Sequence, residues 1–255
     1  MFKRVFQLFK IGRKFASSGA LLTINKIYKL PISIRILFDL LSIGTKKKNL
    51  DNTKTSGQRL CDALQEMGTT FIKLGQFLAT RPDIIGQSLA NDLERLQDKL
   101  PPFGKTVSEN IIKKEIGIKN FEKISNLSNP IAAASIAQVH LATIIEENKE
   151  REVAIKILRP NIEKVFNEEL DALMLLAYII EGTIKKSKRL KLVEVVHLLK
   201  EITNIEMDLR FEAAAANELY ENTKKDFGFN VPKIYWNQTS KKVLCLDKID
   251  GISIR

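Results

Sequence analysis

The stretch PIAAASIAQVHLATIIEENKEREVAIK, from Pro130 to Lys156, carries the pattern from which the architecture of this chain is predicted. It begins with a group of small side chains and continues through Gln138 into a segment rich in β-forming residues. A second such segment, Glu152 to Leu158, follows after a polar interruption. The pattern predicts two β-strands, the first preceded by a turn of small residues and the second carrying Lys156.

This order of features is typical of the ATP pocket of a protein kinase. In that pocket a flexible loop lets backbone N–H groups approach the phosphates, and a lysine on the third strand contacts the α- and β-phosphates. Bulky side chains in the loop would hold the backbone away from the nucleotide. We therefore predict an ATP site formed by Lys156 and by the loop residues Ile131, Ala132, Ala133, Ala134, Ser135, Ile136, Ala137, Gln138 and Val139.

The loop departs from the usual G-x-G-x-x-G pattern because it contains no glycine. Alanine keeps the turn small but disfavours the positive φ that glycine allows. Taken alone, the AAAS string also fits a helix start or a buried alanine surface, and VAIK also occurs by chance in ordinary strands. The order and spacing of the two motifs favour the nucleotide pocket.

The length of 255 residues suits one or two domains with a buried core. The two cysteines, Cys61 and Cys245, are far apart in the sequence and have no C-x-x-C spacing. Neither a disulfide framework nor a zinc site is predicted, so we expect a reducing compartment and no metal-binding residues in this chain.

Positive charge is concentrated at the N-terminus. Residues 1–48 contain 11 of the 41 Lys and Arg residues but one acid, Asp39, so they account for +10 of the net charge of +11. Phenylalanines such as Phe6 and Phe9 recur near helical spacing among these cations, which is the pattern of an amphipathic helix at a membrane surface. Basic and aromatic residues are not interleaved elsewhere, so we expect no nucleic-acid partner.

The same leader has other interpretations. Charged residues interrupt its apolar segments, so it is not predicted to cross a bilayer. Acid-poor N-termini of this kind also resemble mitochondrial transit peptides. A helix that packs its phenylalanines against the protein's own body is a further alternative.

A helical region follows the leader, because apolar residues between Leu60 and Leu78 recur at three- and four-residue steps. Within it, Lys73 and Gln76 are i, i+3 neighbours on one face, and Gly75 allows another element to approach closely. The segment Thr80–Asp83 should break the helix, and a helical pattern should resume over Ile84 to Leu100 until Pro101 stops it.

Two long helices are predicted beyond Lys156, over residues 162–186 and 193–222. On the second, Asp208 and Glu212 stand four residues apart, so both carboxylates should face one way while Glu206 points elsewhere. Such a helix could offer one acid to Lys156 and another to a different cation.

The C-terminal part returns to strands, at Val231 to Tyr235 and Lys241 to Leu246, with a turn over Asp247 to Gly251. Asp226 to Gly228 spells DFG, but it precedes the would-be hinge, so we interpret it as a polar turn. The two histidines, His140 and His197, lie in no histidine-x-aspartate loop, so we predict no catalytic residues here.

Three blocks resemble the UbiB family of atypical kinase-like proteins, which is linked to ubiquinone biosynthesis. FIKLGQFLATRPDIIGQSLANDLERLQDKLPPF (71–103) is similar to the family's KxGQ region. PIAAASIAQVHLA with REVAIKILRP is similar to its alanine-rich loop and pocket lysine, and EMDLRFEAAAAN (206–217) to its ExD motif and αC glutamate. The resemblance covers about residues 50 to 255, the N-terminal part of such a protein.

The resemblance implies site roles that the residues alone do not give. It implies that Glu212 pairs with Lys156, and that backbone groups of Asp247 and Ile249 hold adenine in a hinge, VLCLDKIDG. It also implies a gating role, in place of a peptide-substrate site, for Lys73, Gly75, Gln76, Glu206 and Asp208. The implied cofactor is ATP with Mg²⁺, with metal ligands expected only beyond this chain.

The predicted fold is α+β, with a basic leader at 1–48, a helical KxGQ extension at 49–128 and a kinase-like N-lobe at 129–255 that ends at the hinge. We expect an ATP-binding atypical kinase or ATPase supporting ubiquinone biosynthesis, truncated before its catalytic loop and inactive alone. The alternative is a non-catalytic module that binds lipid or a partner. Expected partners are a membrane surface, quinone intermediates and ubiquinone-biosynthesis enzymes, at the cytoplasmic face of a bacterial inner membrane or in mitochondria.

Overall fold

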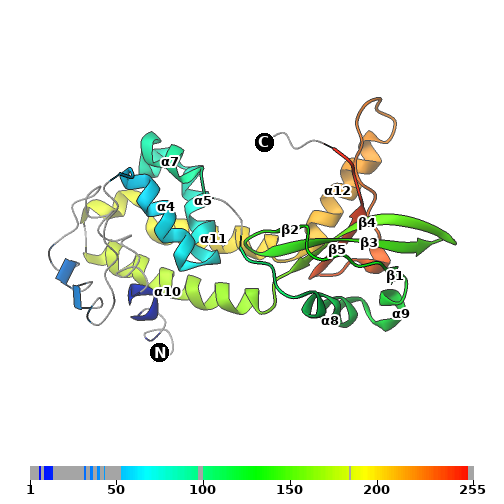
Figure 1. Cartoon of the computed structure of the whole chain (residues 1–255). Helices are drawn as coiled ribbons and strands as arrows, with labels where there is room; N and C mark the ends of the chain where they lie inside the picture. Colours follow the sequence, from blue (N-terminus) through cyan, green and yellow to red (C-terminus); the bar gives the residue numbers. More distant parts are fainter. Residues whose placement is uncertain are drawn as a thin grey trace. The chain divides into compact units, whose positions relative to one another are not determined.

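The computed structural model describes residues 53–96, 100–183 and 185–251, together with residues 6, 9–13, 32, 35–36, 39–40 and 43 of the leader. The chain divides into two compact units: residues 1–98 with 163–201, and residues 99–162 with 202–255. The first is helical and the second contains the sheet (Figure 1). The α+β class is therefore confirmed. The predicted division into regions 1–48, 49–128 and 129–255 stays a prediction.

The helical unit begins with α4 (Ser56–Met67) and α5 (Thr69–Ala79), which are followed by α6 (Pro82–Ile85) and α7 (Gln87–Leu93). A capping box starts α4: the Thr55 hydroxyl accepts from the Gln58 N–H at 3.1 Å, and the Gln58 side chain accepts from the Thr55 N–H at 3.1 Å. Gly68, with φ 104°, separates α4 from α5. The predicted helical periodicity is confirmed, but it is shared between two helices.

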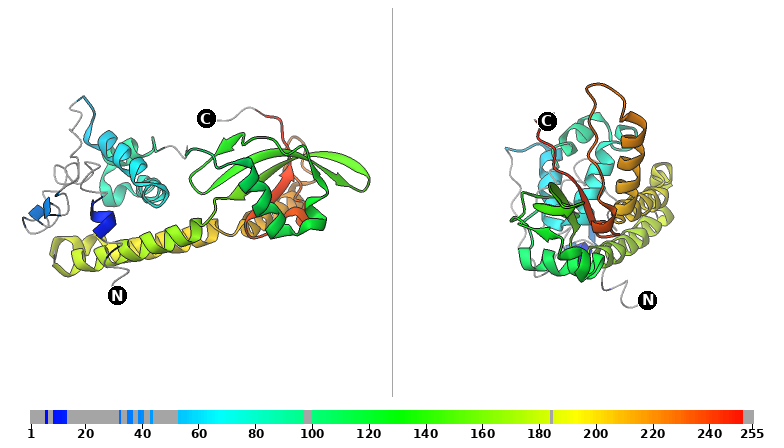
Figure 2. Two further views of the ribbon diagram at one scale, coloured as in Figure 1. Left: turned by 60° about the horizontal axis from the view of Figure 1, so that its bottom comes forward. Right: turned by 90° about the vertical axis from the view of Figure 1, so that its right-hand side faces the viewer.

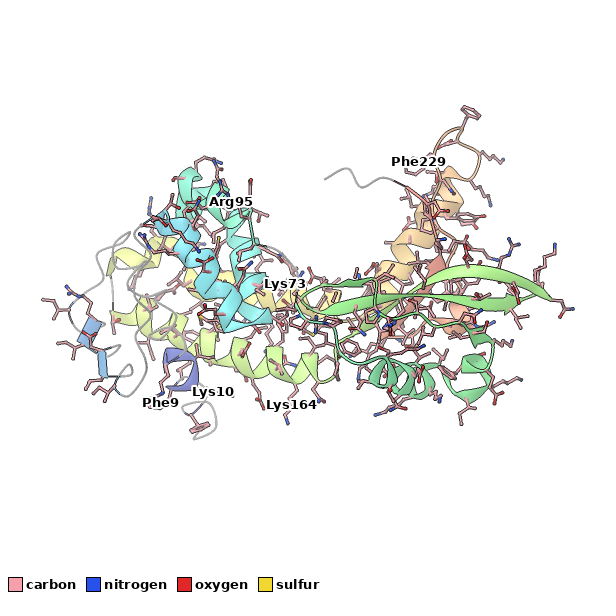
Figure 3. The ribbon with its side chains drawn as sticks, in the orientation of Figure 1. Phe9, Lys10, Lys73, Arg95, Lys164 and Phe229 are labelled. Atoms are coloured by element: carbon pink, nitrogen blue, oxygen red, sulfur yellow. The ribbon has the colours of Figure 1, made fainter. Side chains whose placement is uncertain are left out.

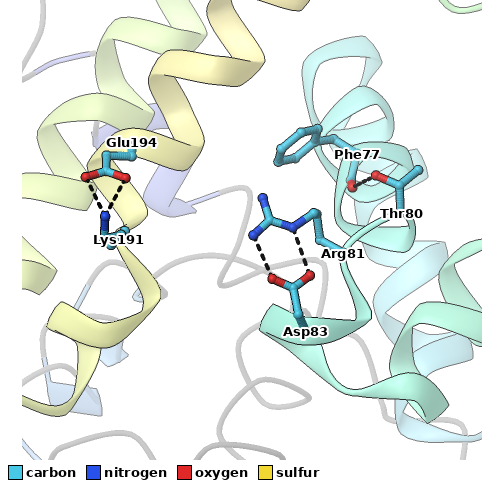
Figure 4. A network of polar contacts seen from close by, with 6 residues as sticks. All are labelled: Phe77, Thr80, Arg81, Asp83, Lys191 and Glu194. Carbon is cyan, nitrogen blue, oxygen red and sulfur yellow. Dashed lines mark hydrogen bonds and ion pairs between the residues drawn. The ribbon is translucent and has the colours of Figure 1, made fainter.

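The break after α5 occurs where it was predicted, and Figure 4 shows its polar contacts. The Thr80 hydroxyl donates to the Phe77 carbonyl at 2.8 Å, and the Arg81 guanidinium forks onto the Asp83 carboxylate at 2.8 and 2.7 Å. The predicted helical pattern over 84–100 is wrong in its extent, because Gly86 interrupts it with φ 84° and α7 ends at Leu93.

A helical hairpin completes this unit, although the last turn of its second helix, residues 202–206, belongs to the second unit. The hairpin consists of α10 (Ile162–Thr183), the 3₁₀ segment η1 (Lys185–Leu190) and α11 (Leu192–Glu206), which run side by side (Figure 2, left). The Glu181 carboxylate accepts from the N–H of Val193 at 3.0 Å, and Lys200 pairs with Asp171 at 3.5 Å. Of all the described helices, none is long and apolar enough to span a bilayer.

The second unit is built on an antiparallel sheet in the order β1 (Ile124–Ser125), β3 (Ala137–Glu146), β4 (Lys149–Leu158) and β5 (Val243–Asp247), and β2 (Ala132–Ala133) also pairs with β3. The β3–β4 ladder is the longest pairing, from Ala137 opposite Leu158 to Glu146 opposite Lys149. Glu147 and Asn148 turn the hairpin with φ 49° and 62°, the backbone that a tight two-residue turn requires.

The two faces of the sheet differ. One face is the core, where Val153, Ile155 and Ile157 pack with Ile112 of α8 (Lys105–Ile116). Side chains alternate along a strand, so Lys156 lies on the opposite face, as does α12 (Leu209–Thr223) (Figures 1 and 2). The short elements α9 (Ile118–Phe121) and η2 (Trp236–Gln238) complete this unit.

Two predictions in this region are wrong. The helix predicted over 193–222 is interrupted, because Met207 and Asp208 separate α11 from α12 and Asp208 has extended backbone (φ −122°, ψ 94°). Asp208 and Glu212 therefore do not share a continuous helical face. Val231 to Tyr235 is not a strand, because pairing is limited to one bridge, Ile234 to Leu246, beside Pro232, which has no N–H to donate.

A buried polar network ties α8 to the start of β3. The Gln138 amide nitrogen lies 2.9 Å from the Ser108 hydroxyl and 2.9 Å from His140 Nε2, and Ser108 lies 2.9 Å from the same ring nitrogen. His140 Nδ1 lies 2.8 Å from the Ser128 carbonyl. All three side chains are fully buried, so this network holds the entrance to β3 rigidly.

The buried imidazole predicts a pH-dependent stability. Burial lowers the pKa of His140 below its usual value of 6.5, because protonation would place a charge among desolvated groups. The unfolded state then binds the extra proton more readily than the folded state. The contribution of the neutral His140 to the free energy of unfolding should therefore be fully present above about pH 6.5 and decrease as the pH drops below it. Urea unfolding at pH 5 to 8 would measure this fall. The variant His140→Gln should lose this component of the pH dependence, and an identical slope in both proteins would contradict the assignment.

Candidate functional site

Lys156 and Glu212 form the centre of the candidate site. Lys156 Nζ lies 2.9 and 2.7 Å from the two carboxylate oxygens of Glu212, so β4 is joined to α12 by an ion pair. The pair is partly open to solvent, with side-chain exposures of 29% and 48%. A pair this exposed adds little to the stability of the fold. Because the lysine is partly open to solvent, its ammonium can also be reached by a third, anionic group.

The alanine loop lies next to this pair. β2 and β3 form a hairpin in which Ala132 is opposite Val139, and Val139 is in turn directly opposite Lys156 on β4. Ser135 and Ile136 form the tip, and the Ala134 N–H donates to the Ala137 carbonyl at 2.8 Å. The loop thus reaches the strand position that carries the lysine, as the sequence predicts.

The individual loop residues lie in different environments. Ile131 and Ala132 are exposed, Ala133, Ala134 and Val139 are half-buried, and Ser135 to Gln138 are buried. The Gln138 side chain turns into the buried network described above, which leaves its backbone for any contact with nucleotide. ATP binding by these residues stays a prediction.

The predicted hinge lies at the end of β5. The Asp247 N–H donates to the Lys233 carbonyl at 3.0 Å, but the Lys233 N–H donates to the Asp247 carboxylate at 3.3 Å, not to the Asp247 carbonyl. The Asp247 carbonyl takes part in neither of these bonds, and its contact with adenine stays a prediction. Ile249, the second predicted hinge residue, follows the strand and is half exposed.

Sequence reasoning missed the support behind this hinge. The Tyr235 hydroxyl donates to the Asp247 carboxylate at 2.5 Å, and burial together with this bond raises the pKa of Tyr235. Lys233 Nζ lies 5.3 Å from the Tyr235 ring centre and pairs with Glu146 at 3.0 Å. Nothing in the local sequence links Tyr235 to Asp247, because the contact depends on the bridge at Ile234.

The KxGQ residues lie on α5, in the helical unit, where Figure 3 labels Lys73. Lys73 and Gln76 are half-buried, and the Gln76 amide donates to the Leu96 carbonyl at 3.4 Å. Gly75 is packed so closely that an added Cβ would lie 2.2 Å from Leu96 Cδ1 and 2.8 Å from Leu64 Cδ1. The expected close approach at Gly75 is confirmed.

The two ExD acids belong to the other unit. Glu206 is the last residue of α11, and Asp208 caps α12 by accepting from the Arg210 N–H at 3.1 Å. The Arg210 guanidinium also binds the Asp208 carboxylate at 2.9 and 2.6 Å, which lowers the pKa of Asp208. As the sequence suggested, Glu212 pairs with Lys156 and Asp208 with a different cation, Arg210, although the continuous helix does not exist. Gating by these residues stays a prediction.

No cluster of three His, Cys, Asp or Glu side chains suited to a metal ion occurs among the residues that the structure describes.

The turn predicted for the DFG tripeptide is confirmed: Lys224 to Gly228 form turns and a bend after α12, and Gly228 has φ 79°.

The second unit defines a class of protein. The features that define it are a loop of small residues between two strands, a lysine on the next strand, a helix carrying its glutamate partner, and a fifth strand that ends at the predicted hinge. Together they form the small lobe of a kinase-like protein.

Comparison with known proteins agrees with this class. Residues 95–255 match the family described as the ABC1 atypical kinase-like domain. Over 199 residues the chain is 40% identical to a protein named "Probable protein kinase UbiB" from Marinobacter nauticus, covering 78% of this chain and 36% of that one. Proteins of the same name from Pseudomonas paraeruginosa and Cellvibrio japonicus are 38% and 35% identical over 201 and 199 residues, covering 78% of this chain and 37% and 36% of theirs.

The chain belongs to the ABC1 atypical kinase-like family. The resemblance to the N-terminal portion of UbiB proteins, inferred from its motifs, is confirmed. The chain spans a little over a third of the length of the curated relatives it matches.

The packing of Gly75 predicts a stability effect that opposes helix propensity. The substitution Gly75→Ala should lower the free energy of unfolding, because overpacking against Leu64 and Leu96 costs about 1–3 kcal/mol and outweighs a propensity gain of about 1 kcal/mol. Gly182→Ala, also in a helix but with nothing within 4 Å of the added Cβ, is the matched control and should be neutral or stabilising. Thermal unfolding of both variants would measure the difference; equal effects would contradict the tight packing at Gly75.

Proposed function

We propose that this chain binds ATP through its kinase-like small lobe and belongs to an atypical kinase or ATPase that supports ubiquinone biosynthesis. The observation that carries the proposal is the Lys156–Glu212 ion pair, located on the strand directly opposite Val139 of the alanine hairpin. A lysine held in this way has its ammonium oriented but not enclosed. It is suited to contact an anionic group that approaches along the hairpin, as nucleotide phosphates do.

Each part of the site has a distinct task in this proposal. Lys156 contacts the α- and β-phosphates, and Glu212 keeps the lysine in place. The alanine hairpin, Ile131 to Val139, covers the phosphates, and the carbonyl of Asp247 and the N–H of Ile249 hold adenine. Mg²⁺, when bound with ATP, neutralises phosphate charge; its ligands are expected outside these 255 residues.

The link to ubiquinone rests on the family alone. Relatives named as probable UbiB protein kinases match most of this chain, which supports a role in the same pathway. Enzymes of that pathway and polyprenyl-quinone intermediates are the proposed partners.

The role of Lys156 is tested by nucleotide binding. We expect Lys156→Ala to weaken MgATP binding by about tenfold or more, because it removes a charge-assisted contact worth about 1.5–3 kcal/mol. Lys149→Ala, an exposed lysine at the other end of β4, is the matched control and should leave the affinity unchanged. Isothermal titration calorimetry would measure both. Equal affinities for the wild type and Lys156→Ala would remove Lys156 from the site.

We also propose that the leader attaches the protein to an anionic membrane surface, on the cytoplasmic side of a bacterial inner membrane or, alternatively, in mitochondria. In the described part of the leader, Phe6 and Phe9 are 69% and 46% exposed, and Lys10 and Arg13 follow them in the sequence (Figure 3 labels Phe9 and Lys10). Exposed aromatic rings beside cations suit the boundary between lipid headgroups and acyl chains.

Co-sedimentation with liposomes tests this attachment. The complete chain should pellet with liposomes that contain phosphatidylglycerol and less with purely zwitterionic ones, and deletion of residues 1–48 should abolish the difference. Equal sedimentation of both forms would remove the leader's role. Lipid binding by a chain that does not bind ATP would instead favour the alternative of a non-catalytic binding module.

A further inference from the structure

The alanine hairpin has an unusual way of closing. A two-residue hairpin turn normally needs positive φ at its first central residue or at both, which is why glycine and asparagine predominate there. Ser135 and Ile136 occupy these positions, and neither has positive φ. Across this turn, in the part of the chain that the structure describes, the backbone hydrogen bond runs from the Ala134 N–H to the Ala137 carbonyl. The second bond of such a turn would run from the Ala137 N–H to the Ala134 carbonyl; here that carbonyl accepts from a side chain instead.

Arg159 provides the replacement. Its Nε and Nη2 atoms donate to the Ala134 carbonyl at 3.0 and 2.9 Å, and its backbone N–H donates to the Ile136 carbonyl at 2.9 Å. One residue thus holds the carbonyl oxygens on both sides of Ser135. The residue lies three positions after Lys156 and directly after β4, so the strand that carries the lysine also carries the clamp.

The guanidinium is itself fixed. Nη1 donates to the Pro101 carbonyl at 2.9 Å, Nη2 is 3.4 Å from the Leu100 carbonyl, and the guanidinium carbon lies 5.9 Å from the centre of the Phe103 ring. Phe103 is anchored in turn, since its N–H and carbonyl bind the Gln138 side chain at 2.9 and 3.1 Å. The buried network around Gln138 and the arginine clamp therefore form one continuous support for the hairpin.

The hydrogen bonds of the Arg159 side chain described above all go to carbonyl oxygens, and none goes to a carboxylate. Burial lowers its pKa, yet arginine stays charged at any ordinary pH. A half-buried cation next to the predicted phosphate loop also contributes a positive potential there. Lysine could not reproduce the arrangement, because its ammonium lacks the planar fork that reaches several acceptors at once.

We infer that Arg159 is a positioning residue for the phosphate-binding hairpin, taking over the role that glycine has in other kinase-like loops. The peptide group is planar and trans, so each N–H points opposite to the preceding carbonyl. By holding the Ala134 and Ile136 carbonyls on its own side, Arg159 directs the N–H groups of Ser135 and Ala137 away from itself and so fixes the orientation of the loop backbone. The structural part of this inference stands by itself; its consequence for ATP rests on the proposed function.

Hydrogen–deuterium exchange without nucleotide tests the clamp. In Arg159→Lys, peptides covering residues 131–139 should exchange about tenfold faster than in the wild type, the factor expected on losing a hydrogen bond to a charged donor. Peptides from α12 should be unchanged. Arg151→Lys, the same substitution at the exposed end of β4, is the matched control and should exchange like the wild type. Unchanged exchange of residues 131–139 in Arg159→Lys would overturn the inference.

The replacement of glycine is tested by rescue. In the double variant Arg159→Lys/Ser135→Gly, glycine can take positive φ, so the turn can close through its own backbone. We expect at least part of the lost protection to return. No recovery would show that Arg159 does not stand in for glycine.

The consequence for nucleotide binding is measured with two ligands. Arg159→Lys should weaken MgATP binding about tenfold while leaving adenosine binding unchanged, because adenosine lacks the phosphates that the hairpin contacts. Equal weakening for both ligands would indicate a general loss of structure and overturn the phosphate-specific role. If the wild type binds neither ligand, the proposed function fails, and the exchange and rescue experiments still decide whether the clamp exists.

Discussion

The register of the β3–β4 ladder is the constraint on which the rest of the site depends. A shift by one residue would turn Lys156 into the core and move Ile155 and Ile157 to the open face, because side chains alternate along a strand. The tight turn at Glu147 and Asn148 and the buried apolar residues facing α8 oppose such a shift. With the register set, Lys156 must lie opposite Val139 and toward α12.

Two supports act on this ladder from opposite faces. Below the sheet, Ser108, Gln138 and His140 form a satisfied polar network, which gives the core a specific geometry that apolar packing alone would not impose. Above it, the Lys156–Glu212 pair is partly solvated and contributes little to stability. The rigid polar groups are thus buried, while the charge of Lys156 remains partly accessible to solvent.

Local sequence was a good guide wherever a feature depends on neighbouring residues. The strands on either side of Glu147, the break at Thr80–Asp83 and the turn at Asp226–Gly228 were all predicted, because turn residues and alternation act over a few positions. The continuous helix over 193–222 and the strand over 231–235 were not correct. An apolar period continues across Met207 and Asp208, and nothing in the local pattern shows that Asp208 leaves the helix to cap the next one.

The class of the fold and the family could be predicted from the amino-acid sequence, because motif order and hydrophobic period are properties of the chain. The pairing of Lys156 with Glu212 followed from the family resemblance. Three contacts appear only in the folded chain: Arg159 holds the alanine hairpin, Tyr235 supports Asp247, and Gln138 turns inward. These contacts join residues 25, 12 and 30 positions apart. The bends of the chain between such residues are set by the packing of the whole unit, so the partners cannot be inferred from spacing.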